Sequence, residues 1–182
     1  GGSSDAAAVM RGILRLSKPP TNLSYLEELG LKIGADVPAC VSKKCVLVSG
    51  IGEVKAHLDR SFDLIFLLIK PEQGISTKLV YDNLNLETCA HPCLDTFLCE
   101  WERGNADGVL KQCGNSLEDS TFQLVEGLAD IKQELLDCGF KSVTMCGSGT
   151  TIFAAGKSIS ETLSIADKFK GRYPFVQATS TY

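Results

Sequence analysis

The sequence lacks the features that mark nucleic-acid-binding and membrane-spanning proteins. Its formal net charge is −4, and its lysines and arginines are scattered instead of forming a basic stripe, so the chain offers no positive field for a phosphate backbone. The longest apolar run, Leu64 to Ile69, is flanked by Asp63 and Lys70 and is far shorter than the roughly 20 residues that cross a bilayer. We therefore expect neither nucleic-acid nor membrane partners.

Cysteine is plentiful, but the pattern of a disulfide-rich secreted domain is missing. The eight cysteines are spread through apolar or helical contexts, so we expect reduced thiols in an intracellular compartment. Cys89, His91, Cys93 and Cys99 lie close enough in the sequence to suggest a zinc site. Their spacing contains neither a two-residue knuckle nor a second pair of ligands, which favours ordinary thiols on a loop and a helix.

Hydrophobic periodicity predicts a mixed α+β protein. With 44% hydrophobic residues, the chain can bury one sizeable core or two small ones. We expect Ser24 to cap the second helix. Helices are expected at residues 6–16, 24–30 (or to 34), 76–83, 92–102, 107–113, 120–136 and 160–170, and strands at 45–48, 62–69, 143–145, 152–155 and 175–181. The strands at 143–145 and 152–155 are expected to form a hairpin joined by residues 147–150.

The succession of predicted helices and strands is least continuous at residues 59–61. It predicts a first domain of residues 1–60 and a second domain of residues 61–182. The last strand, residues 174–182, belongs to the second domain or returns to the first.

The chain opens on glycines and hydroxyl residues that directly precede an alanine-rich helix. Glycines let a phosphate approach the backbone, and the free N–H groups at a helix start attract anions. Ser3 and Ser4 add hydroxyls that can donate to phosphate oxygens, and Ser4 is a candidate Mg²⁺ ligand. The alternative is an ordinary N-cap. The pattern is neither a Walker loop nor a dinucleotide-binding fingerprint, because the required lysine and the preceding strand are missing.

The segment Gly-Gly-Ser-Ser-Asp-Ala-Ala-Ala at residues 1–8 resembles the end of the central phosphate loop of GHMP kinases, usually written Gly-Leu-Gly-Gly-Gly-Ser-Ser-Asp-Ala-Ala. Three further segments are similar to motifs of that superfamily, in the same order. They are Gly-Ala-Asp-Val-Pro at 34–38, Lys-Pro-Glu-Gln-Gly-Ile-Ser-Thr-Lys-Leu-Val-Tyr at 70–81 and Cys-Gly-Ser-Gly-Thr-Thr-Ile-Phe at 146–153. The segment at 70–81 resembles the diphosphocytidyl-methylerythritol kinase branch in particular.

This resemblance implies the GHMP kinase fold. Residues 1–60 would be part of an N-terminal domain of the ribosomal protein S5 domain 2-like type, and residues 61–182 a ferredoxin-like α/β sandwich. Because the chain begins inside the glycine motif, we expect a fragment that lacks the family's lysine beside the catalytic aspartate. We expect this fragment alone to be inactive and poorly soluble, with an exposed sheet edge and an uncovered apolar face.

The resemblance also assigns roles to individual residues. Asp36 would orient the acceptor hydroxyl and take its proton, Thr77 would donate to the substrate, and Tyr81 would stack on cytosine. The residues expected to bind the ATP phosphates are Gly1, Gly2, Ser3, Ser4, Asp5, Gly147, Ser148, Gly149 and Thr150. The structural alternatives are a turn or helix cap at Asp36, a core aromatic at Tyr81 and a plain β-turn at 147–150.

One further segment approximates a family motif. Asn115-Ser116-Leu117-Glu118 is similar to the family's Asn-Asp-Leu-Glu, but Ser116 departs from it. We assign this segment no catalytic role.

The implied reaction is transfer of the ATP γ-phosphoryl group to the 2-hydroxyl of cytidine-diphosphate methylerythritol in non-mevalonate isoprenoid biosynthesis, with Mg²⁺ held mainly by the phosphates. Such an enzyme would be a monomer or weak homodimer. It would be cytoplasmic in a bacterium, or in the plastid stroma of a plant, alga or apicomplexan. The alternatives are a GHMP kinase for a sugar, homoserine or mevalonate-type alcohol, and a pseudo-kinase that binds nucleotide without transfer.

Overall fold

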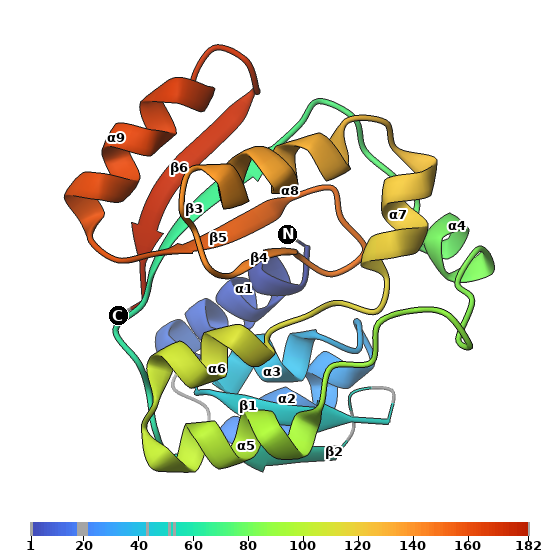
Figure 1. The fold of residues 1–182 in the computed structure, drawn as a ribbon. Coiled ribbons are helices and arrows are strands. Elements are labelled where there is room, and N and C mark those ends of the chain that lie inside the picture. Colours follow the sequence, from blue (N-terminus) through green and yellow to red (C-terminus); the bar gives the residue numbers. More distant parts are fainter. Residues whose placement is uncertain (1, 18–21, 43, 51, 53, 182) are drawn as a thin grey trace. The chain divides into compact units, whose positions relative to one another are not determined.

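The computed structural model describes residues 2–17, 22–42, 44–50, 52 and 54–181, and the chain divides into two compact units, Gly1–Ser61 and Phe62–Tyr182 (Figure 1). Gly1, one of the predicted phosphate-binding residues, lies outside the described residues. Among the residues that are described, no helix is both long enough and apolar enough to cross a membrane.

The first unit packs three helices around a small core and adds a β-hairpin. The helices are α1 (Gly2–Ser17), α2 (Leu23–Leu31) and α3 (Val37–Ser42), and the antiparallel strands are β1 (Val46–Ser49) and β2 (Val54–His57). The core consists of Ala7, Leu26, Val37 and Val41. These residues tie the first helix to the segment that carries Asp36.

Two helix starts in this unit differ from the sequence prediction. The first helix already includes Gly2, so the predicted phosphate residues Gly2, Ser3, Ser4 and Asp5 form its first turn instead of a loop before it. The second helix is capped by Asn22, whose side chain accepts a hydrogen bond of 2.9 Å from the Tyr25 N–H. The prediction of Ser24 as the cap was therefore wrong. Asn22 offers a side-chain oxygen as good as that of serine, earlier in the chain.

One face of α1 is apolar and exposed. Val9 is 61% exposed and Leu16 is 87% exposed. Their spacing of seven residues places them on the same side of the helix. This face is not covered by the part of the chain that the structure describes.

The second unit is built on one antiparallel sheet. Its strands are β3 (Ile65–Lys70), β4 (Val143–Met145), β5 (Ile152–Gly156) and β6 (Phe175–Ser180), and their order in the sheet is β4-β5-β3-β6. This order, with helices after the first and third strands, is that of a ferredoxin-like β-α-β-β-α-β unit. The predicted α+β class and the ferredoxin-like domain are confirmed. The last strand pairs with β3, so it belongs to this unit and not to the β1–β2 hairpin.

Helices precede, connect and cover these strands. They are α4 (Thr77–Asp82), α5 (Leu94–Arg103), α6 (Ala106–Gln112), α7 (Glu118–Leu124), α8 (Leu128–Asp137) and α9 (Ile159–Phe169). Helix α8 packs on β4 and β5, and α9 packs on β3 and β6 (Figure 1). Alternate residues of β3, Leu67 and Ile69, join Leu135 of α8 and Phe169 of α9 in one buried core, as expected for a sheet with a period of two.

The predicted helix at residues 120–136 is instead two helices. Helix α7 ends at Leu124, Val125 is extended, and Gly127 has φ +84° before α8 begins. Val125 and Leu128, on the two sides of the break, belong to the same core. The apolar spacing therefore continues across the interruption, and periodicity alone could not reveal it.

The positive φ of Gly127 gives a test of this break. We expect Gly127→Ala to lower the free energy of unfolding by about 1 kcal/mol, because a Cβ is unfavourable in this conformation. The site itself is open, with no atom within 4 Å of where an added Cβ would lie, so the loss reports backbone conformation. Gly127→Asn should lose less, since asparagine tolerates positive φ. Urea unfolding measures both variants, and an equal loss would contradict this explanation.

Candidate functional site

The turn at residues 147–150 joins β4 to β5, as the predicted hairpin requires. It is closed by hydrogen bonds from the Cys146 N–H to the Thr151 carbonyl (2.8 Å) and from the Gly149 N–H to the Cys146 carbonyl (2.9 Å). Gly149 has φ +93°, and a Cβ there would come within 2.7 Å of the Met145 sulfur. Glycine is therefore favoured at this position by its conformation, and an added Cβ would also force the Met145 side chain to move.

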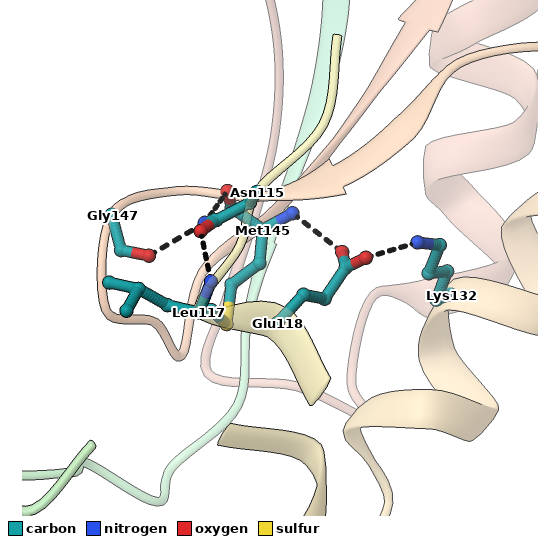
Figure 2. A network of polar contacts seen from close by, with 6 residues as sticks. All are labelled: Asn115, Leu117, Glu118, Lys132, Met145 and Gly147. Carbon is teal, nitrogen blue, oxygen red and sulfur yellow. Dashed lines mark hydrogen bonds and ion pairs between the residues drawn. The ribbon is translucent and has the colours of Figure 1, made fainter. Parts of the chain in front are cut away.

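Side chains from elsewhere in the unit bind the carbonyl groups of this turn (Figure 2). The Asn115 amide nitrogen donates to the carbonyls of Met145 (2.8 Å) and Gly147 (2.7 Å). The Thr121 hydroxyl donates to the carbonyl of Ser148 (3.2 Å). Three carbonyl oxygens at or beside the turn are thus directed toward the body of the unit.

The N–H groups of the turn have the opposite arrangement. In the described part of the chain, no hydrogen bond is found for the N–H groups of Gly147, Ser148 or Thr150. Neighbouring N–H groups without acceptors, on a backbone with positive φ at Gly147 and Gly149, make a concave site that suits an anion. The turn can therefore bind a phosphate group through its backbone.

The other end of this network is an ion pair. One carboxylate oxygen of Glu118 accepts a hydrogen bond of 3.0 Å from the Met145 N–H, and the other pairs with Lys132 of α8 (Figure 2). The side chains of Glu118 and Lys132 are only 12% and 28% exposed. The carboxylate therefore fixes the end of β4 to two helices.

Asn115 and Glu118 belong to the segment to which sequence reasoning gave no role. Its similarity to the family's Asn-Asp-Leu-Glu was the available signal. The departure at Ser116 affects neither contact, because the structure uses the first and last side chains of the motif.

The structure brings two of the predicted site residues from different segments into contact. The Thr77 hydroxyl lies 2.8 Å from the Ser148 hydroxyl, so the start of α4 contacts the glycine turn. The Thr150 hydroxyl donates to the Gln73 carbonyl (2.6 Å). Tyr81 follows Thr77 by one helical turn and is 58% exposed, so the alternative interpretation of Tyr81 as a core aromatic is wrong.

The predicted residues of the first unit lie at the starts of two packed helices, α1 and α3. In the first turn of α1, Ser3 is half-buried while Ser4 and Asp5 are exposed. The Ser4 hydroxyl lies 3.8 Å from the thiol of Cys40 in α3. Asp36 is exposed just before α3, and its carbonyl accepts the Cys40 N–H (3.2 Å). Cys40 thus connects the two segments.

The cysteine cluster does not form a metal site within the described residues. No group of three or more histidine, cysteine or acidic side chains there could hold an ion. The Cys89 thiol lies 3.7 Å from His91, whose ring also contacts the Leu86 carbonyl at 2.9 Å. Cys93 is exposed and accepts a hydrogen bond of 3.1 Å from the Thr96 hydroxyl, which lowers the pKa of its thiol.

This pKa difference predicts an order of alkylation. Burial raises the pKa of Cys113, so at neutral pH Cys93 has the larger thiolate fraction. We expect iodoacetamide to label Cys93 before Cys113 when the folded protein is followed by peptide mass spectrometry. Thr96→Ala should slow the labelling of Cys93 and leave that of Cys113 unchanged. Equal rates for Cys93 in both proteins would show that the hydrogen bond has no effect.

Known proteins resemble this chain in sequence. Residues 101–174 match the family described as GHMP kinases C terminal. The 4-diphosphocytidyl-2-C-methyl-D-erythritol kinase of Clostridium botulinum (strain Eklund 17B / Type B) is 35% identical over 182 residues, which is 100% of this chain and 65% of that protein. The kinase of the same name from Bacillus cytotoxicus is 39% identical over 153 residues, 84% of this chain and 53% of the relative. The chain spans about half to two thirds of the length of these relatives.

Solved structures share the fold. A crystal structure of 4-(cytidine 5'-diphospho)-2C-methyl-D-erythritol kinase has a TM-score of 0.81 at 25% identity, covering 99% of this chain and 64% of that one. L. major mevalonate kinase in complex with R-mevalonate has a TM-score of 0.73 at 14% identity, covering 98% of this chain and 64% of its own. Residues 101–174 of the second unit therefore resemble the GHMP kinases C-terminal family, and the chain as a whole is similar to 4-diphosphocytidyl-2-C-methyl-D-erythritol kinases.

Proposed function

We propose that this chain is part of an ATP-dependent kinase that phosphorylates the 2-hydroxyl of 4-diphosphocytidyl-2-C-methyl-D-erythritol. The observation that carries the proposal is the 2.8 Å contact between the Thr77 and Ser148 hydroxyls. It joins the segment that resembles the substrate motif to the turn that offers N–H groups to phosphate. The similarity to kinases of that name over the whole chain supports the same substrate.

Phosphate binding is assigned to two backbone segments in this proposal. The turn of Gly147, Ser148, Gly149 and Thr150 contributes N–H groups without acceptors among the described residues. The first turn of α1, with Gly2 to Asp5, contributes the N–H groups of a helix start.

Magnesium fits the donor atoms of the first turn of α1. The exposed Ser4 hydroxyl and Asp5 carboxylate are the hard oxygen donors that Mg²⁺ prefers. When bound with ATP, Mg²⁺ supplies charge neutralisation for the phosphates. Ser4 would hold it together with the phosphate oxygens.

Asp36 is the proposed general base. Its position before α3 leaves the residue exposed, where its carboxylate can accept a hydrogen bond from the acceptor hydroxyl and take its proton as the new bond forms. Tyr81 is the proposed base-stacking residue, because its exposed ring offers a flat face that can contribute about 1–3 kcal/mol of stacking. Thr77 donates to the same substrate.

Other properties follow the proposed kinase identity. The substrate is a small molecule, and the enzyme acts as a monomer or weak homodimer. It works in the cytoplasm of a bacterium or in the plastid stroma of a plant, alga or apicomplexan. Segment 70–81 favours the cytidine-diphosphate substrate over sugars, homoserine or mevalonate.

Asp36→Asn tests the proposal in the complete gene product. We expect kcat with ATP and 4-diphosphocytidyl-2-C-methyl-D-erythritol to fall by about 10²–10⁴, because a general base is lost, while the KM for ATP stays within about twofold. Asp107→Asn is the matched control, since Asp107 is an exposed acid in the first turn of α6. A coupled ADP-release assay measures both.

Two results would contradict the assignment. Normal turnover by Asp36→Asn would remove this residue from catalysis. Faster turnover of mevalonate, homoserine or a free sugar by the wild-type protein would replace the proposed substrate.

A further inference from the structure

We infer that Asn115 and Glu118 are positioning residues that hold the glycine turn in the conformation that receives the ATP phosphates. This inference rests on the proposed function, which assigns no role to Asn115 or Glu118. Neither side chain touches the nucleotide in this proposal. Both act through the backbone of residues 145–148.

The contacts of Asn115 use both ends of its side-chain amide. Its nitrogen donates to two carbonyls, of Met145 and Gly147, while its oxygen accepts the Leu117 N–H at 2.9 Å. This set of partners also fixes which end of the amide is nitrogen. A carboxylate of the same shape would keep the Leu117 contact but would face two carbonyl oxygens, so the isosteric Asp is a severe substitution here.

Glu118 fixes the backbone just before the turn. Its carboxylate accepts the Met145 N–H and pairs with Lys132. The Met145 residue is thus bound on both sides, its N–H by Glu118 and its carbonyl by Asn115. Glu118 is also the first residue of α7, where a negative charge is favourable.

These contacts determine the direction in which the N–H groups of the turn point. A peptide that rotates by half a turn exchanges its N–H for its carbonyl, and a carbonyl oxygen repels phosphate. Asn115 holds the carbonyl of Gly147, which shares a peptide group with the N–H of Ser148. Fixing that oxygen in the unit therefore directs the Ser148 N–H outward.

Steady-state kinetics of the complete gene product test the inference. For Asn115→Ala we expect the KM for ATP to rise about tenfold, the effect of one lost hydrogen bond to a charged group, and the KM for the alcohol substrate to stay within about twofold. Asn115→Asp should be at least as impaired. Glu118→Gln should retain more ATP affinity than Glu118→Ala, because it keeps an acceptor for the Met145 N–H.

Asn105→Ala is the matched control. Asn105 also uses its side-chain oxygen to accept a backbone N–H, that of Gly108 at 3.1 Å, at the cap of α6. Its loss should lower the melting temperature without changing the KM for ATP. If Asn115→Ala and Asn115→Asp likewise lower only the melting temperature, the two residues are structural and the inference is wrong.

Equilibrium binding of ATP, measured by calorimetry, separates this inference from the proposed function. If the wild-type protein binds ATP but turns over no alcohol, the proposed function fails. Weaker ATP binding by Asn115→Ala would then still support the positioning role, and unchanged binding would overturn it. A wild-type protein that does not bind ATP would overturn both.

Discussion

A backbone turn offers N–H groups to an anion when its carbonyl groups point away from that anion, and hydrogen bonds to those carbonyls hold them there. In a trans peptide, such as the one that joins Gly147 to Ser148, the carbonyl of the first residue and the N–H of the second point in opposite directions, so the direction of one fixes the direction of the other. In this chain the carbonyls of Met145, Gly147 and Ser148 accept hydrogen bonds from Asn115 and Thr121. The phosphate binding that we propose for residues 147–150 depends on these carbonyl groups being held inside the unit.

The fold of the second unit supplies the partners for this turn. Antiparallel pairing of β4 with β5, with Met145 opposite Ile152, places residues 147–150 at the end of the hairpin. The interruption at Gly127 makes α7 and α8 separate helices. Thr121 of α7 then reaches the turn and Glu118 of α7 reaches the end of β4, while Lys132 of α8 reaches Glu118. The ferredoxin-like topology thus brings together groups that are far apart in the sequence.

Local patterns predicted most elements and part of the site. Alternation and helical spacing predicted β3, α4, α9 and the β4–β5 hairpin to within a few residues, and the glycines at 147 and 149 indicated the turn. The resemblance of two short segments to family motifs also favoured Thr77 and Ser148, which the structure brings into contact. These signals depend on neighbours within a few positions of the chain.

The features that were missed depend on other interactions. The hydrogen bonds of Asn115 join residues 30 and 32 positions apart, a distance that periodicity does not report. The break at Gly127 was hidden because the residues on both sides of it remain buried. The starts of the first two helices were misplaced because several adjacent polar residues were equally suitable.

The most direct measurement of the central claim is the response of the backbone amides of residues 147–150 to nucleotide. In ¹⁵N-labelled complete gene product, a non-hydrolysable ATP analogue with Mg²⁺ should shift the amide resonances of Gly147, Ser148 and Thr150 and protect them from hydrogen exchange. The Gly149 amide, which already donates to the Cys146 carbonyl, should gain little additional protection. Saturating nucleotide that leaves all four amides unchanged would contradict the claim that this turn binds the phosphates.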